Sequence, residues 1–155
     1  MEEEKDLINA IIYTRDDREY ELLKSILLEE QKNAEVSRAV LDGFTHYDRP
    51  YDIAVIALEG AAGMNEALEI KERFPDTRIL WVTSDEDFAQ IAIRNHIYDL
   101  IKRPYEYDRL RESIRKLVSL CTNRFLYQSD VKDDYMTSLQ DLNREWLREH
   151  PVVGA

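Results

Sequence analysis

Short apolar runs alternate along the chain with longer segments in which apolar residues recur at helical spacing. The run at 52–58 is the clearest and is apolar on both faces, which is typical of a central strand in a parallel sheet. Four further runs predict strands at 7–13, 35–41, 78–83 and 98–101. The segments between and after them predict helices at 16–31, 64–74, 85–95 and 107–121, a short helix between 43 and 49, and a loop at 60–63.

The order of these elements predicts an α/β domain with a doubly wound, five-stranded parallel sheet between two layers of helices. Residues 1–118 contain this domain, and residues 119–155 are surplus to it. In the surplus segment, apolar residues follow helical spacing, so we predict a helical C-terminal extension. That stripe consists of Tyr135, Leu139, Leu142 and Trp146. Functional residues of such a sheet are expected at the carboxyl ends of its strands.

Composition narrows the class of partner. The formal net charge is -11 and the pI is about 4.8, which disfavours nucleic acid and anionic membranes as partners. Cys121 is the single cysteine, so no internal disulfide can form, and we expect it at a core or interface position. The acidic start of the chain does not resemble a signal peptide, and no apolar run approaches the roughly 20 residues of a membrane span. These features favour a cytoplasmic protein.

Four segments resemble parts of the receiver domain of bacterial two-component response regulators. They are the strand at 52–57 with its loop to Gly63, the strand at 79–84, the segment 98–105 with its basic-residue–proline turn, and Asp16-Asp17 after the first strand. The order and spacing of these segments match the family over residues 7–118. The resemblance implies the flavodoxin-like receiver fold, a three-layer α/β/α arrangement.

The resemblance also implies a site, and this chain departs from it. In the family an aspartate accepts a phosphoryl group, acidic residues hold a divalent cation, a lysine contacts the phosphoryl group, and a threonine or serine senses it. The aspartate position is Ala57, which has no oxygen to attack a phosphoryl donor. The other matched positions are Arg15 and Asp16 for the acidic pair, Thr83 for the hydroxyl, Leu100 for an aromatic residue and Arg103 for the lysine.

Loss of two carboxylates and gain of the Arg15 cation should weaken magnesium binding strongly, so we expect no cofactor and at most a residual metal contact at Asp16. We expect Arg15 or Arg103 to pair with Asp16 in place of the ion. Asp16 and Asp17 are alternatively simple helix caps. Arg103 is expected to be a structural ion-pair partner rather than a phosphate ligand. Glu59, on the loop after Ala57, is not expected to replace the phosphoacceptor.

These departures predict a pseudo-receiver: a non-enzymatic regulatory or adaptor module that acts through protein–protein contacts. Its expected partner is another signalling protein or a second copy of the chain, bound through the last helices and the C-terminal segment. The alternative is a small-ligand-binding or flavin-type domain that uses the vacated phosphorylation pocket. The loop at 14–18 argues against a phosphate cradle, because it has carboxylates and no glycine.

Overall fold

The computed structural model describes residues 7–42 and 49–122. The helix predicted between 43 and 49 and all but the first four residues of the predicted C-terminal extension lie outside the described residues. The strands are β1 (Asn9–Thr14), β2 (Glu35–Arg38), β3 (Ile53–Ala57), β4 (Arg78–Thr83) and β5 (Asp99–Lys102). The helices are α2 (Asp17–Glu30), α3 (Gly60–Arg73), a 3-10 turn η1 (Glu86–Phe88), α4 (Ala89–Arg94) and α5 (Tyr107–Thr122).

Within the described residues the strands form one five-stranded sheet in the order β2-β1-β3-β4-β5, and every neighbouring pair is parallel. This confirms the predicted doubly wound topology. The register pairs Thr14 with Ala57 and Thr83 with Lys102, each at the last residue of both strands. The carboxyl ends of these strands therefore lie level along one edge of the sheet.

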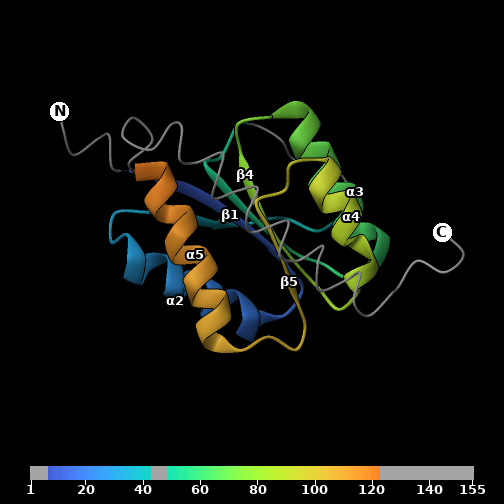
Figure 1. Cartoon of the computed structure of the whole chain (residues 1–155). Coiled ribbons are helices and arrows are strands. Elements are labelled where there is room, and N and C mark those ends of the chain that lie inside the picture. The colour runs from blue at the N-terminus through green and yellow to red at the C-terminus, as the bar shows by residue number, and fades with distance from the viewer. Residues whose placement is uncertain (1–6, 43–48, 123–155) are drawn as a thin grey trace, which may run out of the picture.

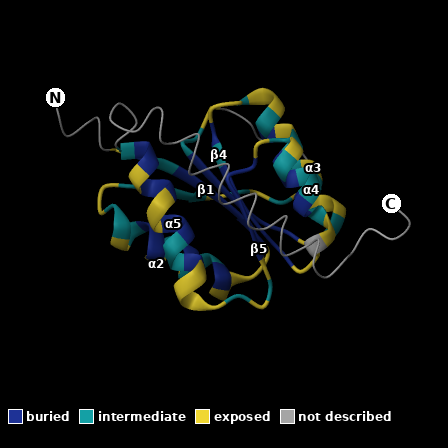
Figure 2. Ribbon diagram, viewed as in Figure 1, coloured by how far each residue is buried: buried dark blue, intermediate teal, exposed yellow. Residues whose placement is uncertain are grey.

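Helices cover both faces of the sheet, as predicted, with α2 and α5 on one side and α3 and α4 on the other (Figure 1). Alternate strand residues point to opposite faces of the sheet. Ile12 and Val55 pack with α2 and α5, whereas Ile56 and Trp81 pack with α3 and α4. The strands β1, β3, β4 and β5 are consequently buried on both faces along most of their length (Figure 2), whereas the edge strand β2 is partly exposed. Apolar burial on both faces is the physical reason that they read as continuous apolar runs.

Several element boundaries differ from the prediction. The loop predicted at 60–63 is wrong, because α3 begins at Gly60, whose φ of 63° turns the extended chain at Glu59 directly into the helix. The segment predicted as one helix at 85–95 is instead the turn η1 followed by the short helix α4. The last helix, α5, ends at Thr122, one residue beyond the predicted 107–121.

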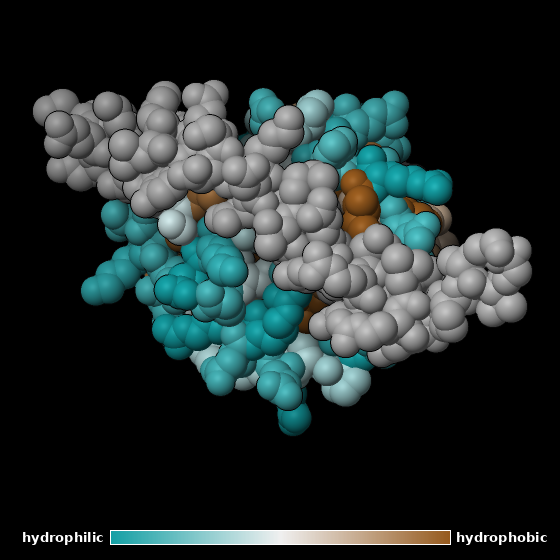
Figure 3. Space-filling view, viewed as in Figure 1, coloured by the Kyte–Doolittle hydropathy of each residue, from teal (hydrophilic) through white to brown (hydrophobic). Residues whose placement is uncertain are grey.

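The surface of the described part is mainly hydrophilic in the view of Figure 3, with small apolar areas. Tyr107, at the start of α5, is among its few exposed large hydrophobic residues. Within residues 7–42 and 49–122, no helix combines the length and apolar character needed to cross a bilayer. The amphipathic helices instead use their apolar faces to cover the sheet.

Gly63 lies where the start of α3 packs closely against the chain after β3, so a substitution there tests this packing. A Cβ atom at this position would lie 2.1 Å from the carbonyl oxygen of Leu58, which is backbone and cannot move aside easily. Alanine normally stabilises a helix by about 1 kcal/mol relative to glycine. We expect Gly63→Ala to lower the free energy of unfolding by about 2 kcal/mol instead, because the site is overpacked.

Urea unfolding measures this effect. Asn65→Ala is the matched control, because Asn65 lies exposed in the same helix and should change stability by about 0.5 kcal/mol or less. Equal stability of Gly63→Ala and the wild type would show that the start of α3 tolerates a side chain at this position.

Candidate functional site

The candidate residues meet at the carboxyl edge of the sheet, around the end of β3. Ala57 is the last residue of β3, and the residue is only 3% exposed. Its carbonyl oxygen accepts a hydrogen bond of 3.2 Å from the Nη2 of Arg103. The position that the resemblance assigns to a nucleophile is thus a buried methyl group beside a guanidinium.

Arg103 joins three parts of the chain at this edge. It follows β5 directly, and its guanidinium donates to Glu19, at the start of α2, from Nε at 3.2 Å and from Nη2 at 2.5 Å. Its Nη1 donates to Glu59, between β3 and α3. The side chain is 22% exposed, so a substantial part of this charge is removed from water. The expectation that Arg103 is an ion-pair partner fits this geometry.

Glu19 is the partner that the sequence did not predict. Its side chain is 8% exposed and accepts hydrogen bonds from Thr14 Oγ1 at 2.8 Å and from Tyr105 Oη at 3.0 Å, besides those from Arg103. The spacing of Asp16 and Glu19 matches a capping box, in which the glutamate would turn back to the cap residue's amide. Here the Asp16 amide bonds to Thr14 Oγ1 at 3.2 Å instead, and Glu19 is left to bind Arg103.

The predicted pairing of Arg15 or Arg103 with Asp16 is wrong for Arg103. The Asp16 carboxylate caps α2, where Oδ1 accepts from the amides of Arg18 at 2.9 Å and Glu19 at 3.4 Å. Arg15 is exposed in the same loop. A carboxylate immediately before a helix finds several free amide donors there, so capping outcompetes a distant cation.

The adjacent residues Asp16 and Asp17 make different contacts. Asp17 points outward, with 89% of its side chain exposed, and pairs with Arg38 at 2.7 Å. The capping role of Asp16 and the outward direction of Asp17 mean that these carboxylates do not converge. Capping was the alternative reading of the pair, and Asp16 fulfils it.

Glu59 carries the densest set of hydrogen bonds in the site. Its Oε1 accepts from Thr83 Oγ1 at 3.2 Å and from the Ser84 amide at 2.9 Å. Its Oε2 accepts from Ser84 Oγ at 3.1 Å, from the Ser84 amide at 3.2 Å and from Arg103 Nη1. Thr83 therefore uses its hydroxyl on an internal carboxylate. Ser84 was not predicted as a site residue, although it directly follows the matched hydroxyl.

The opposite charges of Glu59 and Arg103 each stabilise the ionised form of the other. Burial raises the pKa of Glu59, but hydrogen bonds from Ser84 and Arg103 outweigh it and hold that pKa below 4.5. Burial also lowers the pKa of Arg103, but hydrogen bonds and charge interactions with Glu19 and Glu59 more than compensate and raise that pKa above its ordinary value. For Tyr105, burial and the neighbouring Glu19 raise the pKa to about 12. The Glu59 carboxylate and the Arg103 guanidinium are accordingly charged at neutral pH.

The residues present do not fit the divalent cation that the resemblance implies. The oxygens of Glu19, Glu59 and Ala57 that face the end of β3 are already ligands of the Arg103 guanidinium. Among the described residues, no group of three or more His, Cys, Asp or Glu side chains is placed to hold a metal ion. A second cation beside Arg103 would be repelled by it.

Leu100 and Lys102, on β5 just before Arg103, do not form part of this cluster. Leu100, at the position of the family's aromatic residue, is 3% exposed and lies in the core beneath α3 and α4. Lys102 is exposed at the end of the strand. Arg103, rather than Lys102, is therefore the basic residue of this turn that reaches the end of β3.

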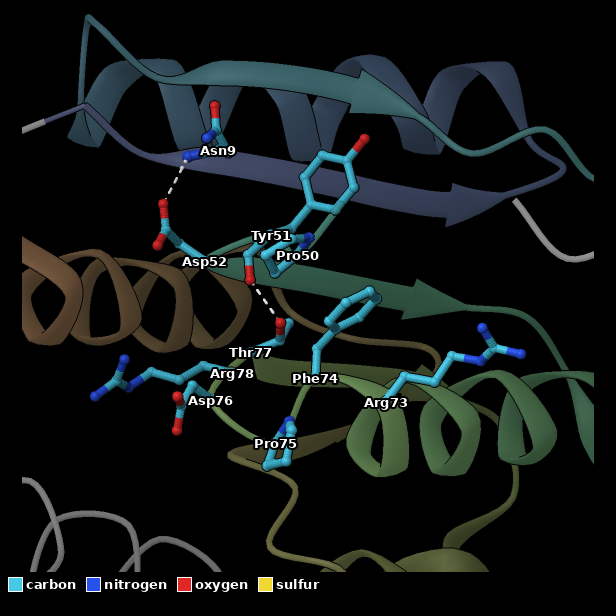
Figure 4. Close-up of a pocket in the computed structure, with 10 residues that line it drawn as sticks. All are labelled: Asn9, Pro50, Tyr51, Asp52, Arg73, Phe74, Pro75, Asp76, Thr77 and Arg78. Atoms are coloured by element: carbon cyan, nitrogen blue, oxygen red, sulfur yellow. Dashed lines mark hydrogen bonds between the residues drawn. The ribbon is translucent and has the colours of Figure 1, made fainter. Parts of the chain in front are cut away.

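A pocket lies at the opposite, amino-terminal edge of the sheet (Figure 4). Two hydrogen bonds frame it, from the Asn9 amide to Asp52 at 2.9 Å and from the Thr77 hydroxyl to the Tyr51 carbonyl at 2.6 Å. Its lining comprises Asn9, Pro50, Tyr51, Asp52, Arg73, Phe74, Pro75, Asp76, Thr77 and Arg78. It shares no residue with the candidate site.

Comparisons with known proteins bear on the fold. No protein-family model and no curated protein sequence matches this chain. Solved structures do match it. The beryllofluoride-activated receiver domain of DrrB superimposes with a TM-score of 0.60 at 14% identity, covering 73% of this chain and 98% of that one.

Two further structures agree. A CheY-like receiver domain from Methanospirillum hungatei matches with a TM-score of 0.57 at 15% identity, covering 76% of this chain and 98% of that domain. An orphan response regulator of H. pylori matches with a TM-score of 0.58 at 17% identity, covering 72% and 96%. The chain thus has the fold of receiver domains, and identities this low concern the fold alone.

Replacing Arg103 tests whether its guanidinium supports the fold. Arg103→Met keeps the apolar stem but leaves the buried Glu19 carboxylate without its cation. We expect the free energy of unfolding to fall by about 3 kcal/mol in urea titrations. The double variant Arg103→Met/Glu19→Gln should regain part of this loss, because the uncompensated charge is gone.

Arg73→Met is the matched control, since Arg73 pairs with Glu69 where both side chains are about half exposed. It should cost about 1 kcal/mol or less. Similar losses for Arg103→Met and Arg73→Met would contradict a supporting role for the Arg103 guanidinium.

The lowered pKa of Glu59 predicts a pH dependence. In the unfolded chain this pKa returns toward 4.5, so the ionised carboxylate stabilises the folded state fully above pH 4.5. The contribution disappears as the pH falls from 4.5 through the lower folded-state pKa. The stability difference between wild type and Glu59→Gln should therefore narrow over this acid range in urea unfolding, and a difference independent of pH would contradict this.

Proposed function

We propose that this chain is a receiver-like regulatory module that does not accept a phosphoryl group and acts through protein–protein contacts. The observation that carries the proposal is the Arg103 guanidinium, bound at once to Glu19, Glu59 and the Ala57 carbonyl. In this arrangement a guanidinium and two carboxylates occupy the edge where phosphorylation would need an open nucleophile and a metal ion. The module is regulatory rather than enzymatic in this proposal.

The chemistry of the site supports the absence of phosphoryl transfer. Ala57 has no nucleophilic atom, and the nearest carboxylates are already hydrogen-bonded. A carboxylate attacks phosphorus through a free lone pair, and its reactivity falls when donors and a cation stabilise its charge. Glu59, with its lowered pKa and its bonds to Ser84 and Arg103, is a poor nucleophile for this reason.

A protein partner fits the surface better than nucleic acid or membrane. The net charge of -11 opposes both of these polyanions. Helix α5 presents a mixed surface, with Tyr107 42% exposed and with Asp108, Arg115 and Lys116 also exposed. Aromatic and charged side chains of both signs suit a protein interface. In the proposal, α5 and the C-terminal segment bind another signalling protein or a second copy of the chain.

The small-ligand or flavin-type alternative gains no support from the described residues. The position beside Ala57 that it would use is taken by Arg103, whose Nη2 lies 3.2 Å from the Ala57 carbonyl oxygen. The adjoining loop, where Asp16 caps α2, presents carboxylates rather than a glycine-rich phosphate cradle. We therefore retain the protein-contact function.

Incubation of the full chain with acetyl phosphate and magnesium tests the proposal. We expect the intact mass of the denatured protein to be unchanged, because no side chain at the end of β3 can form a phosphoryl adduct. We also expect the sedimentation coefficient of the native chain to be the same with and without the donor, since any self-association is independent of phosphorylation. A phosphorylatable receiver domain treated in parallel verifies the donor.

A stoichiometric phosphoryl adduct on the full chain would overturn the proposal. A donor-dependent change in sedimentation would overturn it too, because such a change would couple assembly to the donor.

A further inference from the structure

The pocket at the amino-terminal edge of the sheet has walls that hydrogen bonds hold in place. Its volume is about 620 Å³. One wall is the chain just before β3, and the other is the turn between α3 and β4. The Thr77 hydroxyl donates to the Tyr51 carbonyl at 2.6 Å, and the Arg78 amide donates to the Asp52 carbonyl at 3.0 Å. Lys71 Nζ closes the turn by donating to the Thr77 carbonyl at 3.3 Å, so the pocket is a preformed part of the fold.

The lining combines an apolar surface with charges of both signs. The rings of Tyr51 and Phe74 lie on either side of Pro50 in Figure 4, and both residues are partly buried. Asp76 adds a carboxylate and Arg78 a guanidinium. Aromatic and apolar surface beside opposite charges suits a peptide segment better than a simple ion.

The guanidinium of Arg78 has no carboxylate partner among the residues that the structure describes. Its side-chain hydrogen bond is long, at 3.9 Å from Nη1 to the Sγ of Cys121. Burial and, after it, the charge of Arg78 lower the pKa of the Lys71 amine, although Asp76 acts in the opposite direction. A carboxylate beside Arg78 would offset this repulsion between cations.

The contact between Arg78 and Cys121 also places the end of α5 at the pocket. Cys121 lies in the last turn of α5, which ends at Thr122, and the chain continues with residues 123–155. Residues 123–132 separate this helix end from Asp133, and about ten residues span as much as ~33 Å when extended. The sequence from Asp133 onward therefore reaches the pocket with ease.

The sequence Asp133-Asp134-Tyr135 complements the pocket chemically. Its two carboxylates match the unpaired charge of Arg78, and its ring matches the apolar surface at Phe74. Lys132, directly before it, supplies a cation for Asp76. Aromatic anchors with charged neighbours of both signs are common where a segment binds a protein surface.

We propose that Asp133-Asp134-Tyr135 docks in this pocket of its own chain, with its carboxylates beside Arg78 and its ring against Phe74. Tethering gives the segment an effective concentration of the order of millimolar, so modest contacts suffice to hold it. The inference goes beyond the proposed function, because part of the C-terminal segment is bound by its own domain and only the rest is left for a partner. It does not depend on phosphorylation, since Arg103 lies at the opposite edge.

Amide resonances of the ¹⁵N-labelled full chain test this docking. The variant Asp133→Asn/Asp134→Asn/Tyr135→Ala removes the charges and the ring but keeps the length of the segment. We expect the resonances of Phe74 and Asp76 to shift relative to the wild type, because both residues line the pocket. The shift should be the same at every protein concentration, because the contact is within one chain.

The other segment that leaves this edge of the sheet provides the control. Residues 1–6 precede Asn9, which lines the pocket, and they are acidic but contain no aromatic residue. Glu2→Gln/Glu3→Gln/Glu4→Gln removes negative charge near the pocket without removing a ring. We expect it to leave the Phe74 and Asp76 resonances unchanged.

A synthetic peptide of residues 128–139 measures the same contact in competition. It should bind the full-length triple variant of residues 133–135 at least about tenfold more tightly than the wild type, whose pocket is already filled by the tethered segment. Arg78→Gln in that variant should weaken peptide binding, and Arg78→Lys should restore part of it because the charge returns.

Unchanged Phe74 and Asp76 resonances, or equal peptide affinities of the triple variant and the wild type, would overturn the inference. An equal shift from the substitutions at residues 2–4 would overturn it too, since the pocket would then respond to charge in general. A shift that grows with protein concentration would assign the pocket to the segment of a second copy. None of these results bears on the mass measured after acetyl phosphate treatment.

Discussion

The ion pairs of the Arg103 guanidinium with Glu19 and Glu59 determine how the chain segments at the carboxyl edge of the sheet must be arranged. Glu19 is nearly buried, and an unpaired carboxylate in such a position would be costly, so the Arg103 cation has to reach it. Arg103 can do so only if the starts of α2 and α3 and the chain after β5 meet at the same edge. The parallel register supplies that condition, since Thr14 lies beside Ala57 and binds Glu19. Fold and site thus depend on the same contact.

A cation that belongs to the chain differs physically from a bound ion. Arg103 is present at every ion concentration, and the raised pKa keeps it charged. Its planar group fixes the directions of its bonds to Glu19, Glu59 and the Ala57 carbonyl. The partners differ in exposure, at 8% for Glu19 and 48% for Glu59. The site therefore has a buried inner half and an outer half that solvent reaches.

The sequence predicted the inner strands of the sheet well because they are buried on both faces, as the continuous apolar run of β3 shows. The prediction failed at the start of α3, because Glu59 is not among the residue types that commonly cap helices. In the structure its side chain binds Ser84 and makes no capping hydrogen bond. The prediction identified Arg103 as an ion-pair residue but chose the wrong partner. Arg103 and Glu19 are separated by 84 positions, and only the tertiary structure brings them together. The resemblance suggested Asp16 instead, in place of the metal ion, but the carboxylate of Asp16 accepts from local amide donors.

The departures from the receiver pattern are physically interdependent. Arg103 without Glu59 would lose one of its two carboxylate partners, and Glu59 without Arg103 would place a second carboxylate near Glu19 with no cation between them. An aspartate at position 57 would add a third negative charge to the same cluster. The alanine removes that repulsion, so Ala57, Glu59 and Arg103 are best understood as one compatible set. Their mutual fit, rather than the fold shared with phosphorylated receivers, argues that the site works through internal charge pairing.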